Sequence, residues 1–462
     1  MRAKTAKLNL DFGPGGISMN FAKANDFQPR YGVENDWTAG TVSFNGEKFE
    51  DFPGISQNRI NEDRIKAIAN TINRTIEEWQ RDYGYDFDSH IEITISAAFF
   101  DVLSFPYSIE FSEYRDITEG DIKKIEKCKR PENMYRIPIP DEKLKSFTSP
   151  YFTVSSGRKI LEPVNEKTKS LGFNAYFITK HPALSRLLEL MREDEERINI
   201  SLSCEKGFRA LVSKEEKKSK VALIHVTDFM SEFSVWENSE LKYLNKKETG
   251  FAKIKEAIWR LCLCYHKKTE LTKLDFELVQ NRKYMQKFHD NVRKNEISEE
   301  SKELLSADDC SALLELASCV LEDETEDSVK YSRFELPGKN KSRTKLTVSS
   351  YVLNYFTREA VLSLLSEIKQ VMYDDDFCSP GSVILECSLP LKGMEKLAET
   401  VFGIPVRRAC VKWNEEIRRD LSSSAVGALQ SLISGKGRKD NAGVRKKTTK
   451  LFSIIGNILS RA

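Results

Sequence analysis

Long hydrophobic runs are missing from this sequence. It has no stretch of roughly 18 or more apolar residues, which excludes an ordinary membrane-spanning helix, and no apolar segment follows Met1, so we expect no standard signal peptide. It also has no HExxH pattern, and its five histidines form no arrangement typical of a nucleophilic triad. Cys262 and Cys264 lack a second Cys or His pair at zinc spacing. These absences argue against a zinc enzyme or a nucleophilic hydrolase and favour a cytoplasmic protein.

An excess of one charge is missing as well. The 72 Lys and Arg residues against 70 Asp and Glu residues leave a net charge of +2, so no overall field favours nucleic acid as a partner. The nine cysteines are odd in number and scattered, which predicts reduced thiols and no disulfide framework. A chain of 462 residues is expected to divide into about two to four subdomains.

The C-terminus carries a distinct pattern. When residues 448–462 are wound as a helix, the apolar side chains fall within an arc of about 160°. These side chains are Leu451, Phe452, Ile454, Ile455, Ile458 and Leu459. A basic, glycine-containing run precedes them and ends in Lys446, Lys447 and Lys450. The pattern predicts a tethered helix that lies on an anionic membrane surface, and the alternative is a terminal helix docked on its own domain.

The order of predicted elements indicates an α/β fold. Residues 7–23 read as strand, Gly-rich turn and strand, and residues 90–100 as a β-rich run. Residues 62–84 read as a strong helix whose one face carries Ile65, Ile68, Ile72, Ile76 and Trp79. A small α+β module follows, in which the capping-box-like spacing of Thr118 and Asp121 predicts the start of a short helix, and then a helix over 182–197. Residues 220–250 then read as three strands, 251–266 as a helix, 348–376 as a long helix, and 382–409 as strand, loop, helix and strand.

This order and several local strings resemble the actin/Hsp70/hexokinase superfamily, and within it most of all the FtsA family of bacterial cell-division actin homologues. LDFGP at 10–14 stands where the family has its first phosphate-binding turn, LDIGT. ITEGDI at 117–122 is similar to the string that begins the family's inserted subdomain. GMEKLAETVFGIPVR at 393–407 is similar to the family's terminal motif.

The resemblance implies an actin-like two-lobed fold with ribonuclease-H-like halves, a small inserted α+β subdomain and a C-terminal amphipathic helix. On this basis we divide the chain into a first α/β subdomain (1–105), the insert (106–181), a second lobe (182–381), a return to the core (382–433), a basic linker (434–447) and a membrane-targeting helix (448–462).

The phosphate-binding strings depart from the family. HVTDFMSE at 225–232 replaces DIGGGTTD, so its glycines are gone, His225 replaces a carboxylate and Phe229 would fill space near the phosphates. ECSLP at 386–390 likewise replaces TGGxS. The vestigial nucleotide-binding set is Asp11, Gly13, Gly15, Ser231 and Glu232. We expect binding of ATP with Mg to be weak or lost, with no hydrolysis and no catalytic or metal site; the alternative is that Asp11 and Gly13 only form a tight hairpin.

The function implied by the resemblance is that of a non-enzymatic adaptor. Such a protein tethers a tubulin-like, FtsZ-type division polymer to the cytoplasmic face of the inner membrane at the division site, recruits other division proteins and self-associates. The alternatives are an ATPase or kinase of the same superfamily, an actin-like scaffold of a pilus or secretion system, and a paralogue without a division role.

Overall fold

The computed structural model describes the body of the chain in separate ranges. These are residues 4–13, 16–23, 42–43, 62–86, 91–128, 143–149, 151–154, 159–160, 162–191, 198–227, 230–266, 282–294, 314, 317–321, 331–337, 343–374, 380–387 and 391–409. The predicted linker 434–447 and terminal helix 448–462, with all the predicted membrane-binding residues, lie outside them. No helix within these ranges is long and apolar enough to cross a membrane.

The first half of the body is built on a sheet with the strand order β11-β5-β1-β2-β3. Its strands are β1 (Lys4–Gly13), β2 (Gly16–Lys23), β3 (Val42–Ser43), β4 (Tyr85–Asp86, on β1), β5 (Ile91–Ile95) and β11 (Ile198–Leu202). Helix α1 (Glu62–Tyr83) covers the sheet and packs against α3 (Pro182–Leu190). The predicted apolar stripe of α1 is confirmed at Ile65, Ile72 and Ile76, which are buried because they recur at helical spacing.

The second half repeats this topology. Its sheet has the order β14-β13-β12-β17-β18. The strands are β12 (Lys220–Val226), β13 (Ser231–Glu237), β14 (Glu240–Lys247), β17 (Ser382–Cys387) and β18 (Val406–Arg408). In each sheet three consecutive strands pair antiparallel, and two further strands add in parallel beside the first of them. The prediction of an α/β fold with two ribonuclease-H-like halves therefore agrees with the strand order.

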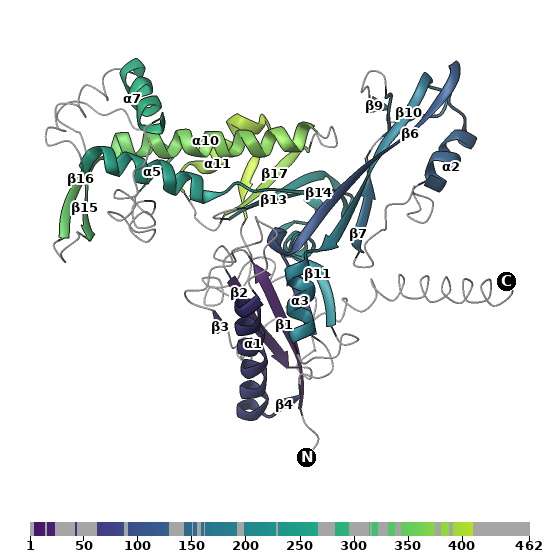
Figure 1. The fold of residues 1–462 in the computed structure, drawn as a ribbon. Helices are drawn as coiled ribbons and strands as arrows, with labels where there is room; N and C mark the ends of the chain where they lie inside the picture. The colour runs from purple at the N-terminus through teal and green to yellow at the C-terminus, as the bar shows by residue number, and fades with distance from the viewer. Residues whose placement is uncertain are drawn as a thin grey trace.

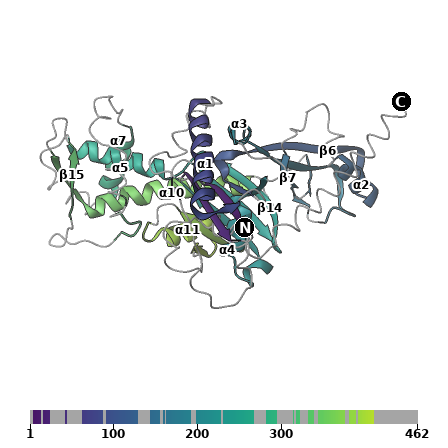
Figure 2. The same ribbon diagram turned by 90° about the horizontal axis from the view of Figure 1, so that it is seen from below.

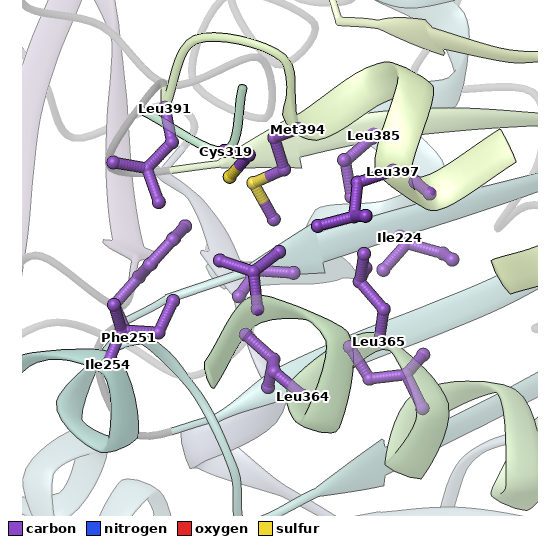
Figure 3. Close-up of a cluster of buried hydrophobic side chains, with 14 of the residues drawn as sticks. Ile224, Phe251, Ile254, Cys319, Leu364, Leu365, Leu385, Leu391, Met394 and Leu397 are labelled. Atoms are coloured by element: carbon purple, nitrogen blue, oxygen red, sulfur yellow. The ribbon is translucent and has the colours of Figure 1, made fainter. Parts of the chain in front are cut away.

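Helices and a hairpin extend the second half to one side. These elements are α5 (Phe251–His266), α7 (Arg282–Lys294), β15 (Tyr331–Pro337), β16 (Arg343–Ser349), α10 (Ser350–Asp374) and α11 (Met394–Phe402). The predicted long helix is α10, and its residues Leu364, Leu365 and Ile368 are fully buried in the core of this half. Figure 3 shows Leu364 and Leu365 facing Leu385 and Leu397 from β17 and α11.

A third sheet lies between β5 and α3 in the chain. It consists of β6 (Phe100–Asp116), β7 (Lys143–Thr148), β8 (Tyr151–Phe152), β9 (Lys159–Ile160) and β10 (Lys167–Lys180), accompanied by α2 (Glu119–Cys128). The sheet has an apolar cluster of its own, which includes Ile117, Leu171 and Phe173. We call residues 100–180 the inserted module.

The start of α2 has the predicted capping geometry. The carboxylate of Asp121 accepts hydrogen bonds from the backbone N–H of Thr118 (3.0 Å) and its hydroxyl (2.7 Å), and the Asp121 N–H donates back to the Thr118 hydroxyl (3.3 Å). Arg115 donates two bonds of 2.8 Å to the same carboxylate, and this pairing holds the pKa of Asp121 well below its usual range.

The structure differs from the predicted division at two boundaries. The third sheet begins at residue 100 rather than 106, because β6 runs on directly from the short turn after β5. Strand β11 and α3 belong to the first half and not to a second lobe starting at 182, since β11 pairs with β5 and α3 packs on α1. The predicted helix 182–197 ends at Leu190.

The two extensions lie at opposite ends of the molecule. In Figure 1 the inserted module, with β6, β10 and α2, rises to one side, whereas α5, α7 and β15–β16 lie at the other, above the sheet of the first half. Figure 2 shows the same separation from below. The two halves meet between these ends, around α4 (Ser203–Leu211), whose Phe208 stacks on Trp236 of β13 with ring centroids 4.1 Å apart.

Candidate functional site

The first phosphate-side hairpin is a tight, regular pair of strands. Asp11 lies opposite Ser18, and Gly13 lies opposite Gly16, at the end of β1 and β2. Asp11 is buried, with 2% of its surface exposed, in the central strand of its sheet. The carbonyl of the next residue, Phe12, accepts a hydrogen bond of 3.1 Å from the N–H of Ser96. The hairpin thus contacts the short turn that follows β5. Gly15 lies outside the described residues.

In the hairpin between β12 and β13, which the resemblance compares with the second phosphate motif, the two described turn residues bond to each other. The Thr227 hydroxyl accepts from the N–H of Met230 (3.1 Å) and donates to its carbonyl (2.8 Å), while the Thr227 N–H donates to the same carbonyl (2.9 Å). A phosphate-binding turn needs N–H groups that are free to meet the ligand. These two N–H groups are already used, and the intervening residues, including Phe229, lie outside the described ranges.

Ser231 and Glu232 both point into the protein. The hydroxyl of Ser231, fully buried, donates to the carbonyl of Thr249 at 2.7 Å. The carboxylate of Glu232, 4% exposed, accepts from the N–H of Ala97 (2.9 Å) and lies 3.1 Å from the Ser203 hydroxyl at both oxygens. Burial raises the pKa of Glu232, and the nearby His225 and these hydrogen bonds oppose that rise.

Lys246 holds the same turn from the neighbouring strand. Its ammonium group donates to the carbonyl of Ala97 (3.1 Å) and to the carbonyl of Phe100, and it pairs with Asp101 at 3.2 Å. Lys246 lies directly opposite Glu232 in the β13–β14 pair. One cross-strand pair of the second half therefore binds both the N–H and the C=O of Ala97 in the first half.

Apolar side chains pack next to the segment that the resemblance compares with the adenosine-side motif of the family. The TGGxS replacement begins at Glu386 and Cys387, and the residues that follow, 388–390, lie outside the described ranges. Beyond them, the Lys392 carbonyl accepts from the N–H of Cys319 at 2.8 Å. Figure 3 shows Cys319 and Met394 next to each other, with Leu391 facing Phe251 across the cluster. Burial raises the pKa of the Cys319 thiol to about 12, so this thiol stays neutral.

A hollow of about 290 Å³ lies elsewhere, among α5, α7 and α10. Its cationic and acidic side chains compensate one another, because Lys253 pairs with Glu367 (2.7 Å) and Arg260 with Glu256 (2.7 Å). Phe356 contributes an apolar wall. A balanced lining of this kind does not by itself select an anion or a cation.

Several described groups that could have met ATP with Mg make their hydrogen bonds within the protein. The carboxylate of Glu232 accepts hydrogen bonds from Ala97 and Ser203, and the N–H groups of Thr227 and Met230 in the β12–β13 turn are both bonded within the turn. Within the described ranges no group of three or more His, Cys, Asp or Glu residues could hold a metal ion. Weak or lost binding of ATP with Mg stays a prediction, and these internal contacts are the observations that support it.

The sequence predicted some residues of this region and missed others. Asp11, Ser231 and Glu232 were predicted; Glu232 accepts from the N–H of Ala97, and the carbonyl of Phe12, the neighbour of Asp11, accepts from the N–H of Ser96. Ser203 and Lys246 were missed. Lys246 lies in a run of ordinary polar residues, so no local signal distinguishes it. The buried ion pair between Lys206 and Glu92 was also missed; a glutamate inside the apolar IEITI strand was the available signal.

Comparisons with known proteins assign this chain to no family. No family model and no curated protein matches the chain. Solved structures that are similar include the PilM-PilN type IV pilus biogenesis complex, with 12% identity over 94% of this chain and 99% of that chain and a TM-score of 0.46. MreB5 of Spiroplasma citri bound to ADP has 8% identity over 94% and 99%, with a TM-score of 0.46. A non-polymerising mutant of MamK bound to AMPPNP has 7% identity over 93% and 98%, with a TM-score of 0.44. Since these scores are below 0.5, the strand order shared by the two sheets carries the assignment to an actin-like α/β fold.

Proposed function

We propose that this protein is a membrane-associated, actin-like adaptor of cell division. Its body holds a tubulin-like, FtsZ-type polymer and other division proteins at the cytoplasmic face of the inner membrane, and its C-terminal helix binds the lipid surface. The body acts through its surfaces and not through turnover of a nucleotide.

The internal hydrogen bonds of the Glu232 carboxylate support the non-enzymatic part of this proposal. This carboxylate is buried and bonded to Ala97 and Ser203, so it is not available to position a metal ion or a water molecule for hydrolysis. The two halves are joined through protein contacts at the place where the resemblance puts the phosphates. A body of this kind is suited to scaffolding.

The membrane part of the proposal is supported by the sequence of the tail. The last described strand, β18, ends at Arg408, and the basic run and the amphipathic stretch follow it in the chain. A short apolar face supplies modest and reversible binding to a bilayer surface, which the basic residues strengthen on anionic lipid. Self-association would add avidity, because several tails would then bind the same membrane.

Co-sedimentation with vesicles tests the tail. The full chain is compared on anionic and neutral lipid with a chain that ends at Lys447 and with the double variant Phe452→Asp, Ile455→Asp. We expect the full chain to bind anionic vesicles and both altered chains to stay in solution, because charges on the apolar face cannot enter the bilayer boundary. The matched control, Ser453→Asp with Asn457→Asp, adds the same charge to the polar face.

The outcomes separate the proposal from its alternatives. Equal sedimentation of the full and truncated chains would refute the proposal that the C-terminal helix binds the membrane. It would favour a terminal helix docked on its own domain, in a scaffold that makes no lipid contact of its own. If the full chain binds, adding a polymerised FtsZ-type protein should bring that polymer down with the vesicles only when the adaptor is present. Failure of that step would refute the division role while leaving the membrane role intact.

A further inference from the structure

The turn between β5 and β6 is held from the second half by two side chains that face each other across one pair of strands. Glu232 of β13 accepts from the N–H of Ala97 at 2.9 Å, and Lys246 of β14 donates to the carbonyl of the same residue at 3.1 Å. Both groups come from one hairpin, so they move as one unit. A shift of the second half relative to the first would break both bonds together.

The bonds are made where water is scarce. The side chain of Lys246 is 18% exposed, and Glu232 is buried. When a hydrogen bond to a charged group breaks at a buried position, water cannot take the place of the lost partner. The free-energy cost is therefore larger than for a hydrogen bond at the surface. The second partner of Glu232 is the hydroxyl of Ser203, the first residue of α4, which belongs to the first half as well.

The turn between β5 and β6 leads directly into the first strand of the inserted module. Strand β6 starts at Phe100, three positions after Ala97, and Lys246 also binds the carbonyl of Phe100 and the carboxylate of Asp101. The module touches the second half beside this point, since Phe147 of β7 packs against Tyr243 of β14 with ring centroids 6.2 Å apart.

A second ion pair holds the module to the first half. Lys145 of β7 pairs with Glu205 of α4. The base of the module therefore lies between α4 of the first half and β14 of the second, with charged contacts to both. Its orientation depends on how the two halves sit against each other.

We propose that Glu232, Lys246 and the backbone of Ala97 form a latch that fixes the second half on the first without nucleotide and sets the position of the inserted module. The latch adds two polar bonds to the apolar contact that Phe208 and Trp236 make between the halves. It concerns the body of the protein and stands whether or not the tail binds a membrane.

Hydrogen exchange of the full chain, read out by mass spectrometry on peptides covering residues 96–101, tests the latch. Glu232→Leu removes the acceptor of the Ala97 N–H at similar volume, and Lys246→Met removes the ammonium group but keeps the stem. We expect each variant to speed exchange of this segment about tenfold or more, with a smaller effect for Glu232→Gln, which keeps an acceptor oxygen. The matched control is Lys242→Met on the same strand, whose partner Glu240 is exposed.

Three results would overturn the latch. The first is an exchange rate at residues 96–101 that stays at the wild-type value in both Glu232→Leu and Lys246→Met. The second is an equally large increase of this rate in Lys242→Met. The third is a wild-type protein whose residues 96–101 are protected from exchange only when Mg-ATP is added. If Glu232→Leu fails to fold, Lys246→Met decides alone, since that side chain is partly exposed at the edge of the contact. Unchanged exchange in the strands β12 and β13 shows that the effect is local.

Discussion

Replacing Arg407 with methionine is expected to lower the free energy of unfolding by about 1 to 2 kcal/mol at pH 7. Arg407 lies in β18, at the end of the string GIPVR. Its guanidinium donates to both oxygens of Glu216, at 2.6 and 2.8 Å, and to the carbonyl of Leu211 at 2.8 Å. The guanidinium of Arg407 therefore connects the last described strand to the segment between α4 and β12.

The magnitude follows from the pKa of Glu216. The hydrogen bonds from Arg407 and, secondarily, from the Ser213 N–H lower this pKa from 4.5 to about 2. At about 1.4 kcal/mol per pKa unit this corresponds to roughly 3 kcal/mol. Because 38% of the Arg407 side chain is exposed, solvent screening reduces the expected contribution to the range given above.

The sign of the pH dependence is fixed by the direction of the shift. A carboxyl whose folded pKa lies below its unfolded value stabilises the fold at pH values above the unfolded pKa, and the stabilisation disappears as the pH falls toward the folded pKa. The difference between wild type and Arg407→Met should therefore be full at pH 7 and shrink as the pH is lowered from about 4.5 toward 2.

Urea denaturation followed by tryptophan fluorescence measures these differences. A double-mutant cycle with Glu216→Gln isolates the pair, and Arg81→Met, which removes an exposed arginine paired with Asp82, is the control expected to change stability by less than about 0.5 kcal/mol. A coupling energy near zero, or a destabilisation by Arg407→Met that is the same at pH 7 and pH 3, would refute the reasoning.

Further outcomes are expected from packing and from the nucleotide region. Phe208→Ala should cost about 3 to 5 kcal/mol in urea denaturation, because it removes the ring stacked on Trp236 inside the core; a loss below 1 kcal/mol would contradict this packing. Gly172→Ala should lower the melting temperature of the inserted module, since the added Cβ would lie 2.8 Å from a ring carbon of Phe152, whereas Gly120→Ala in α2 meets only an ordinary contact at 3.5 Å and should not lower it. Mg-ATP should leave the melting temperature unchanged, and a clear rise would refute the interpretation of the site, because a ligand that binds the folded state at many times its Kd stabilises it.

The sequence by itself determined the elements whose signal is local. The spacing of Ile65, Ile72 and Ile76 predicted α1 and its buried face, and the Thr118 to Asp121 spacing predicted the cap of α2. The glycines after Phe12 predicted the β1–β2 hairpin. Each of these patterns depends on interactions between residues that are near in the sequence, so the corresponding element can be predicted without knowledge of distant partners.

The sequence also predicted part of the candidate site. The loss of glycines at 225–232 indicated a poor phosphate site, which stays a prediction; in the structure Thr227 and Met230 of this segment bond to each other. The direction in which Ser231 and Glu232 point was not predictable. The orientation of each side chain depends on its hydrogen-bond partner in the packed structure, which is the carbonyl of Thr249 for Ser231 and the N–H of Ala97 for Glu232.

Only the tertiary structure decided which distant residues meet. The INISL segment of β11 has no local sign that it joins the first sheet, and its pairing with β5 moved a predicted boundary. Glu232 is 135 positions from Ala97, and Arg407 is 191 positions from Glu216. Hydrophobic periodicity fixes the type and the buried face of an element, but polar partners are chosen by the packing of whole sheets and helices, because an unpaired buried charge is costly in every other arrangement.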